Sequence, residues 1–216
     1  MKPADLFQRY EMLVARADGA FNKIAKEYPG CIRCKRHCSD CCHAVFGLFL
    51  VEAAYLQKYF NQLGRKERRA AILRGKKANR DLQKIEKRLQ TQHDDPRTAG
   101  YALERERIRC PLLDDNKECI LYSHRPITCR VYGIPTAIQG KAHVCRKAGF
   151  KNGQSYPAFN LDEVQRELFY LSREVLQKAH RGNAEKAALL ISVSKTIETP
   201  LEDIIQESFA GSVTAY

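Results

Sequence analysis

The chain has 216 residues, and its 37 Lys and Arg against 25 Asp and Glu give a formal net charge of +12. This length is sufficient for one domain with a hydrophobic core and does not require a second core. No apolar run approaches the ~20 residues that span a bilayer, so a membrane protein is not expected. The sequence starts without an apolar secretory segment, and we therefore expect a cytoplasmic protein with reduced cysteines.

Apolar residues recur at helical spacing through most of the chain. Residues 5–28 have the pattern of an amphipathic helix that Pro29 and Gly30 end, and residues 52–60 are expected to form a second helix. Residues 61–90 are predicted to form a long basic helix, because eleven Lys or Arg stand there against three acidic residues and a sparse apolar stripe. The basic side chains are expected on its outward face.

The C-terminal part is also predicted to be helical. Asn160 is placed to cap a helix that begins at residue 161, and a further helix is expected over residues 184–197. The predicted fold class is mainly α, with helices packed around loop-rich metal-binding segments and at most a small β-hairpin. We expect residues 1–216 to form a single cysteine-cluster domain, in which residues 61–109 are a basic helical insertion and residues 158–216 a C-terminal helical subdomain.

The segment from Cys31 to Cys42 reads CIRCKRHCSDCC and holds five of the nine cysteines. A C-x2-C step lets two thiolates approach one metal while the intervening backbone turns toward sulfur. Disulfides are disfavoured because nine is an odd number and no oxidising compartment is indicated. Cys41 and Cys42 are adjacent, so their side chains are expected to diverge, with one facing the metal site and the other facing the core or a second site.

A second cysteine group follows, with gaps of eight, nine and fifteen residues between its members. The turn-forming residues 114–117 are expected to close a short hairpin that brings the first two of these cysteines together. We expect the two groups to meet in space in a shared or paired site. The candidate metal ligands are Cys31, Cys34, Cys38, Cys41, Cys42, Cys110, Cys119, Cys129 and Cys145.

The cysteine spacing favours an iron–sulfur cluster over a zinc ribbon. A zinc ribbon separates its two C-x2-C knuckles by about 15–20 residues, whereas here only three residues separate Cys34 from Cys38. A [4Fe–4S] cluster is the favoured cofactor, and zinc remains the alternative. Arg125 and Arg130 are candidate cofactor-binding residues that could donate hydrogen bonds to anionic sulfur. Four histidines are candidate ligands or outer donors: His37, His43, His124 and His143.

The order of these motifs resembles a known family. The block that ends in Cys41 and Cys42 is followed by C-P-L-L, C-I-L-Y and R-P-x-x-C-R. This order resembles the bacterial CxxCxxCC cysteine-cluster proteins. These proteins are described as zinc- or iron-chelating domains and are often labelled Fe–S oxidoreductases. The resemblance runs from about Cys31 to Cys145, although the gap between Cys34 and Cys38 is one residue longer than usual. Flagellin lysine N-methylases resemble the same block. The resemblance implies metal binding, and it leaves open an oxidoreductase or a methyltransferase-like activity.

Two functions from different classes follow from these observations. The first is a metal-binding cytoplasmic protein, with an iron–sulfur cluster and a redox or cluster-dependent enzymatic role. The alternative is a structural zinc-binding module that acts as an interaction or nucleic-acid-binding protein. The basic balance suggests an acidic partner or an electron-transfer protein. Nucleic acid is less favoured, because residues 61–90 contain no aromatic side chain to stack on bases.

Overall fold

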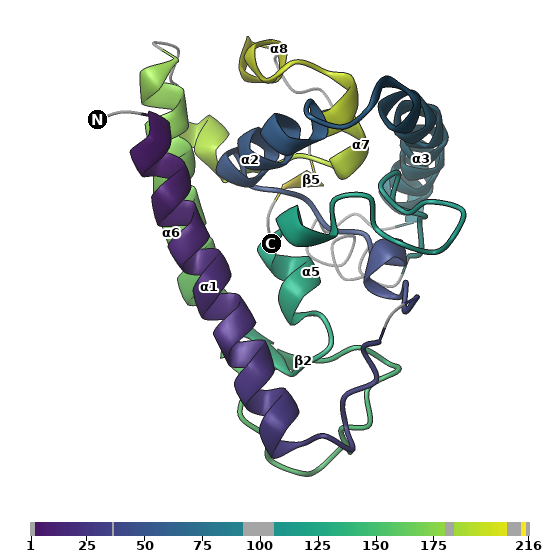
Figure 1. The fold of residues 1–216 in the computed structure, drawn as a ribbon, viewed down its shortest axis with the longest axis vertical. Coiled ribbons are helices and arrows are strands. Elements are labelled where there is room, and N and C mark those ends of the chain that lie inside the picture. The colour runs from purple at the N-terminus through teal and green to yellow at the C-terminus, as the bar shows by residue number, and fades with distance from the viewer. Residues whose placement is uncertain (1–2, 36, 93–105, 180–183, 207–212, 215–216) are drawn as a thin grey trace.

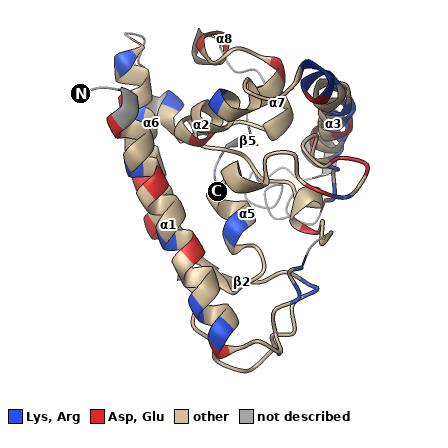
Figure 2. Ribbon diagram, viewed as in Figure 1, with Lys and Arg blue, Asp and Glu red and all other residues tan. Residues whose placement is uncertain are grey.

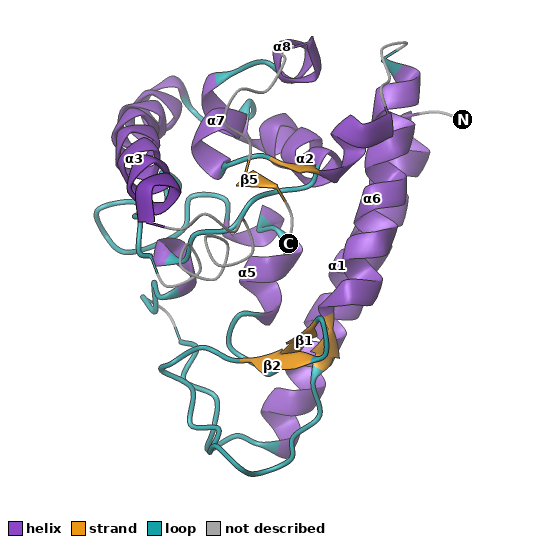
Figure 3. Ribbon diagram, turned by 180° about the vertical axis from the view of Figure 1, so that it is seen from behind, coloured by secondary structure: helices purple, strands orange, loops and turns teal. Residues whose placement is uncertain are grey.

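Figure 1 shows the fold in a computed structural model, which describes residues 3–35, 37–92, 106–179, 184–206 and 213–214. The fold is mainly α-helical, as predicted, with small strands at two places. Figure 3 shows long loops that connect the helices, and most of the nine cysteines lie outside the α-helices and strands. None of the helices in the described ranges is long and apolar enough to cross a lipid bilayer.

Two long helices lie side by side and run in opposite directions. These are α1 (Pro3–Glu27) and α6 (Leu161–Lys178) (Figures 1 and 3). Arg9 contacts Glu174 at 2.8 Å near one end of the pair, and Arg16 contacts Glu167 at 2.7 Å further along. The Asn160 side chain accepts a hydrogen bond from the Glu163 backbone N–H at 3.2 Å, which confirms the predicted helix cap.

The central helix α2 (Leu50–Phe60) packs against α1, α6 and the C-terminal helices. Residues 50–56 are all buried, because neighbouring helices cover this helix on several sides. The Val51 N–H donates to the Ser172 hydroxyl of α6 at 3.2 Å, and the Tyr55 ring packs against Tyr10 of α1 with centroids 4.7 Å apart. The core of the molecule therefore lies around α2.

The basic helix is α3 (Arg65–Gln92), and it packs against α7 (Val193–Glu198). Ala71, Ala78 and Leu89 of the predicted apolar stripe are buried. The stripe is thus confirmed at these three positions. The last helix is α8 (Leu201–Gln206), which begins directly after Pro200.

The prediction of one helix over residues 184–197 is wrong. The chain forms a 3₁₀ turn η3 (Ala184–Ala188), a short strand β4 (Leu189–Leu190) paired with β5 (Val213–Thr214), and only then α7. Ile191 exchanges two backbone hydrogen bonds with Leu48, at 2.8 and 2.9 Å. Ser192 then caps α7 by accepting from the Lys195 N–H at 3.1 Å. The hydrogen bonds of β4 and Ile191 hold this part of the backbone in an extended conformation. The spacing of apolar residues in the sequence does not indicate that conformation.

A small sheet joins the loops to the N-terminal end of α6. Its order is β2 (Lys141–His143), β1 (Thr136–Ile138), β3 (Phe159–Asn160), with β1 antiparallel to β2 and parallel to β3. Gln139 and Gly140 connect β1 to β2 with positive φ angles of 49° and 71°, as a tight two-residue hairpin turn requires. The hairpin predicted around residues 114–117 is reduced to one bridge, between Leu113 and Cys119.

Candidate metal centre

The two cysteine groups meet through backbone hydrogen bonds. The Cys110 N–H donates to the Cys42 carbonyl at 2.7 Å, and the Ile108 N–H donates to the His43 carbonyl at 3.0 Å. The pairing continues as an antiparallel bridge between Ala44 and Arg107. The prediction that the groups come together is therefore confirmed, because residues nearly 70 positions apart in the chain are directly bonded.

Cys41 and Cys42 lie in a 3₁₀ turn, η1 (Cys41–His43), which follows the first cysteine loop. The turn is closed by hydrogen bonds from the Cys42 N–H to the Ser39 carbonyl at 3.1 Å and from the Ala44 N–H to the Cys41 carbonyl at 3.3 Å. Both residues line the same cavity, and their thiols are hydrogen-bonded to each other. The expectation that they diverge is wrong, because a 3₁₀ turn does not send successive side chains to opposite sides as a strand does.

The later cysteines are positioned by two short elements. Cys110 and Cys119 approach each other where the Ile120 N–H donates to the Leu112 carbonyl at 2.9 Å. Cys129 lies in α5 (Ile127–Val131), which follows the 3₁₀ turn η2 (Tyr122–His124). Helix α5 packs against α1, and the Ile127 N–H at its start donates to the buried carboxylate of Glu52 at 3.1 Å.

Five cysteines line one cavity of about 70 Å³: Cys41, Cys42, Cys110, Cys119 and Cys129. Its remaining walls are mostly apolar, and they include residues 44–46, Leu112, and Ala78 and Leu82 of α3. The first residues of the apolar run after Cys42 thus lie beside the cysteines. Arg125 also lines the cavity and brings a positive charge to it. Arg109 lines it as well, so the enclosure holds several thiols, two cations and mostly apolar walls. Such a set suits a thiolate-bound metal group, because soft, polarisable sulfur ligands favour zinc and iron–sulfur clusters.

The thiols surround this space and do not meet at one point. Among the residues that the structure describes, no three His, Cys, Asp or Glu side chains are grouped so that they could hold a metal ion. Rotation about the cysteine χ1 angles would be needed to bring several sulfurs to a single ion.

The thiols of the cavity differ in acidity. A hydrogen bond from Cys42 lowers the pKa of Cys41 to about 7, with a smaller contribution from the positive charge of Arg125. The same hydrogen bond raises the pKa of Cys42, and burial raises it further. Burial raises the pKa of Cys110 to about 12 and that of Cys119 to about 11. Cys41 is therefore the thiol of this group that is most readily deprotonated near neutral pH, and a bound metal would deprotonate the others.

The remaining cysteines lie outside the cavity lining. Cys34 contacts Gly133 so closely that a methyl group there would collide with its sulfur. The Cys145 thiol donates to the Asp40 carboxylate at 3.3 Å, and Arg107 and Lys147 also contact this carboxylate, at 2.9 and 3.4 Å. Desolvation raises the pKa of Cys34 to about 11, and the neighbouring Cys38 and Cys145 add to this effect. Cys34, Cys38 and Cys145 therefore form a second group beside the cavity.

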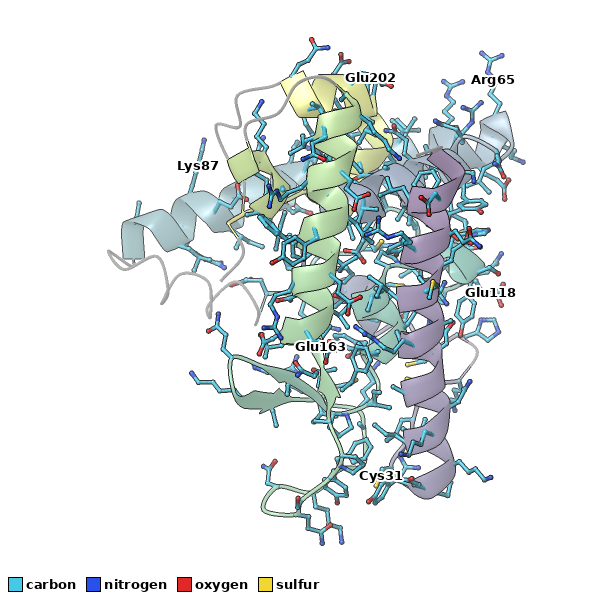
Figure 4. All side chains as sticks on the ribbon, turned by 90° about the vertical axis from the view of Figure 1, so that its left-hand side faces the viewer. Cys31, Arg65, Lys87, Glu118, Glu163 and Glu202 are labelled. Carbon is cyan, nitrogen blue, oxygen red and sulfur yellow. The ribbon has the colours of Figure 1, made fainter. Side chains whose placement is uncertain are left out.

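Cys31 occupies a separate position near the end of α1 (Figure 4). Its carbonyl accepts a hydrogen bond from the Gly149 N–H at 2.7 Å, and its Cα would lie 3.1 Å from a methyl group at position 149. Glycine at this position permits that close approach. The backbone of Cys31 thus connects the first cysteine loop to the chain that follows Cys145.

The two candidate arginines have different surroundings. Arg125 lines the cavity, donates to the Tyr122 carbonyl at 3.0 Å and stacks on the Tyr122 ring at 3.7 Å. The guanidinium of Arg130 instead contacts Asp18 of α1 at 2.7 Å and donates to the Arg125 and Ser123 carbonyls at 2.8 and 2.6 Å. Arg130 is not among the residues that line the cavity, and its contacts fix α5 and the preceding loop to α1.

The candidate histidines lie outside the cavity lining in the described structure. His43 contacts the Ser39 carbonyl at 2.9 Å, and His37 contacts the Asn116 carbonyl at 3.1 Å. His124 stacks in parallel on Tyr59 with centroids 3.5 Å apart. His143 belongs to β2, and its carbonyl accepts from Thr136. These contacts join the histidines to loop carbonyls and to a neighbouring ring.

Sequence reasoning missed two carboxylates that organise the site. Glu52 is buried and links α2 to the start of α5, and Asp40 connects Cys145 to Arg107. Glu52 stands within an apolar helix pattern, so a charged residue on a buried face was the available signal. Asp40 offered no comparable signal, because its partners are distant in the chain.

The fold and the site define a helical protein that carries a cysteine-lined cavity between loops. Residues 33–146, slightly more than half of the chain, match the CxxCxxCC family, whose description reads "Putative zinc- or iron-chelating domain". The chain belongs to this family, and its membership supports metal binding. The matched range includes eight of the nine cysteines and begins after Cys31. Comparisons with curated proteins and with solved structures find no match.

Proposed function

We propose that the protein is a cytoplasmic iron–sulfur protein whose cluster is held in the cavity lined by Cys41, Cys42, Cys110, Cys119 and Cys129. The observation that carries this proposal is the presence of five thiols from three separate segments around one mostly apolar cavity. A [4Fe–4S] cluster requires four thiolates, so four of these residues would be ligands and one would be an outer neighbour. The bound cluster would supply one-electron transfer.

The chain's own residues would tune such a group. Arg125 places a positive charge beside thiolates that carry negative charge, and its stack on Tyr122 keeps the guanidinium in place. Phe46, Leu112 and the α3 residues Ala78 and Leu82 give the cavity an apolar wall, which would disfavour water beside a bound cluster. Exclusion of water and hydrogen bonding to sulfur are both known to set the reduction potentials of clusters. These features favour a redox role over a purely structural zinc module.

Metal and sulfide analysis of the anaerobically purified protein tests the proposal. We expect iron and acid-labile sulfide in similar amounts and a brown protein that absorbs near 400 nm. A colourless protein that contains zinc and no sulfide would instead establish the structural zinc module. This measurement separates the two candidates, because zinc is d¹⁰ and has no redox activity.

A matched pair of variants tests which cysteines hold the cluster. C129S removes a thiol that lines the cavity, whereas C31S removes a thiol that lies outside both the cavity lining and the family match. We expect C129S to lose most of its iron and sulfide and C31S to retain them. Equal loss in both variants would show that the cavity is not the site.

A further inference from the structure

A band of cations runs along the outward face of α3. Nine of its Lys and Arg side chains are exposed, and at 100° per residue they all fall within an arc of about 140° on the helix surface. The nine residues are Arg65, Lys66, Arg69, Lys76, Lys77, Arg80, Lys84, Lys87 and Arg88. We call this arc the cationic face. Figure 2 shows the basic segments along α3, and Figure 4 shows Arg65 and Lys87 near its opposite ends.

The cationic face contains no carboxylate. Glu67, Asp81 and Glu86, which are the acidic residues of α3, project outside this arc on the same helical geometry. Within the described structure, the ion pairs of the nine cations join Lys84 to Asp81 at 3.8 Å and Arg88 to Glu106. Glu198 of α7 also interacts electrostatically with Lys76. In the part of the chain that the structure describes, six of the nine cations have none of these acidic neighbours. Over 23 residue steps, the face extends for roughly 35 Å.

The opposite side of α3 is held by specific contacts. Asn79 donates to Glu198 at 3.0 Å and accepts from Ser194 at 2.5 Å, both in α7. A methyl group at Gly75 would lie 2.5 Å from the Glu198 carboxylate, so the two helices approach closely there. Arg74 donates to the Pro111 carbonyl at 2.8 Å. The cationic face is thus carried by a helix that is fixed to the rest of the molecule.

The composition of this face favours phosphate groups over a protein partner. Stable protein interfaces depend on buried aromatic and apolar anchors and are depleted in Lys. The only exposed large hydrophobic residue of α3 in the described structure is Leu73, at 60% exposure. Cations without carboxylates or aromatic anchors are the groups that contact a nucleic-acid backbone.

We propose that the cationic face of α3 binds the phosphate backbone of double-stranded nucleic acid without sequence specificity. The absence of exposed aromatic rings on α3 argues against unpaired strands, which use base stacking, but it does not argue against duplexes. The length of the face is close to one turn of a B-form duplex, about 34 Å. This surface is separate from the cysteine cavity, which only the opposite side of α3 lines, through Ala78 and Leu82.

Titration of the full, metal-loaded chain against a fluorescent 20-base-pair duplex tests the proposal, with fluorescence anisotropy as the readout. If about five phosphates are bound, affinity should fall about 500-fold between about 50 and about 200 mM salt, since each phosphate adds about 0.9 to the slope of log affinity against log salt. The variant R69Q/K76Q/R80Q/K87Q should bind more than about 30-fold more weakly at the lower salt concentration. For this variant, the slope of log affinity against log salt concentration should be smaller by about 0.9 for each phosphate that it no longer neutralises.

A matched control changes the same net charge on other helices. K23Q/K26Q/R166Q/R173Q removes four exposed cations from α1 and α6, and we expect its affinity to stay within about threefold of the native protein. Circular dichroism and metal content would verify that both variants fold. The control would separate a local binding face from a general effect of the +12 net charge.

Three results would overturn the proposal. The first is equal weakening in the two variants, which would assign binding to net charge alone. The second is tighter binding of polyglutamate than of duplex at the same ionic strength, which would identify an acidic protein as the partner. The third is tighter binding of a single strand than of the duplex, or no binding of the duplex at the lower salt concentration.

Discussion

One buried carboxylate connects the helix that carries Cys129 to the central helix of the fold. Glu52 is only 3% exposed, and its two oxygens accept separate backbone hydrogen bonds, from Phe49 at 3.2 Å and from Ile127 at 3.1 Å. Burial raises the pKa of Glu52 to about 7, although these N–H donors and the Tyr10 hydroxyl oppose the shift. The carboxyl group is therefore expected to titrate near neutral pH in the folded protein.

This shift makes the stability of the fold depend on pH. Because the folded pKa lies above the ordinary value of 4.5, the folded state binds the proton more tightly. The resulting stabilisation is fully present below pH 4.5 and is lost as the pH rises through about 7. Between about pH 5.5 and about pH 8, the native protein should lose about 2 kcal/mol relative to a variant with no titrating group at this position.

The substitution E52Q provides that comparison. Glutamine keeps the shape of the side chain but offers one acceptor oxygen to two N–H donors, so we expect a constant penalty of about 1–3 kcal/mol. The advantage of native protein over E52Q should therefore shrink by about 2 kcal/mol from about pH 5.5 to about pH 8. Urea unfolding followed by circular dichroism measures this difference in the free energy of unfolding, with both proteins in the same metal state.

The control is E27Q, which removes a negative charge from the exposed end of α1. Its difference from the native protein should change by less than about 0.5 kcal/mol over the same range. If the difference between native protein and E52Q is equally constant, Glu52 is not held protonated, and the argument from its burial is wrong.

Three further predictions concern the cysteines. G133A should displace Cys34, because the new methyl group would collide with its sulfur, and the alkylation rate of Cys34 should change while the iron content stays near the native value. R125Q should raise the pKa of Cys41 in metal-free protein, because Arg125 lowers it. The pH profile of Cys41 alkylation measures this, and R166Q, which removes an exposed cation of α6, is the control. An unchanged profile in R125Q would contradict the reasoning. Removal of the metal by a chelator should leave most of the helical circular dichroism signal unchanged. Proteases should then cut faster within residues 31–51 and 110–149. Equal cutting rates with and without metal would show that the metal does not order these loops.

The sequence predicted the helices whose apolar face repeats over several turns. The predicted spans 5–28 and 52–60 correspond to α1 and α2 within two residues at each end, and α3 and α6 are found where the stripe and the Asn160 cap placed them. Periodicity succeeds here because each helix buries one continuous stripe. It failed over residues 184–197, where pairing of Ile191 with the distant Leu48 prevailed over helix propensity.

The candidate site was predicted in composition but not in arrangement. The cysteine count was enough to predict that the two groups meet. It could not show that Cys41 and Cys42 share a cavity, because this depends on the 3₁₀ turn η1. Nor could it distinguish Arg125 from Arg130, since the partner of Arg130 is Asp18, 112 residues away.

Arginine side chains hold the second cysteine segment independently of any metal. Arg74 donates to the Pro111 carbonyl at 2.8 Å, Arg109 donates to the Leu113 and Asp114 carbonyls at 3.1 and 2.8 Å, and Arg130 donates to two further carbonyls. Such hydrogen bonds from charged donors contribute about 1.5–3 kcal/mol each, less where the donor is exposed.

The first cysteine segment has fewer interactions of this kind. Arg107 donates to the Asp40 carbonyl at 2.8 Å, and the Gly149 N–H donates to the Cys31 carbonyl at 2.7 Å. The loop between these two points carries exposed Cys34 and His37, the latter with a positive φ of 64°. Of the first segment, only Cys41 and Cys42 line the proposed metal site, at the end of this loop. Metal loss should therefore release residues 31–40 before it releases the segment around Cys119, because arginines continue to hold the later loop after the bonds to Cys41 and Cys42 are gone. Mass spectrometry of the earliest proteolytic fragments would reveal the order, and first cleavage near Cys119 would show that the arginine hydrogen bonds do not provide this support.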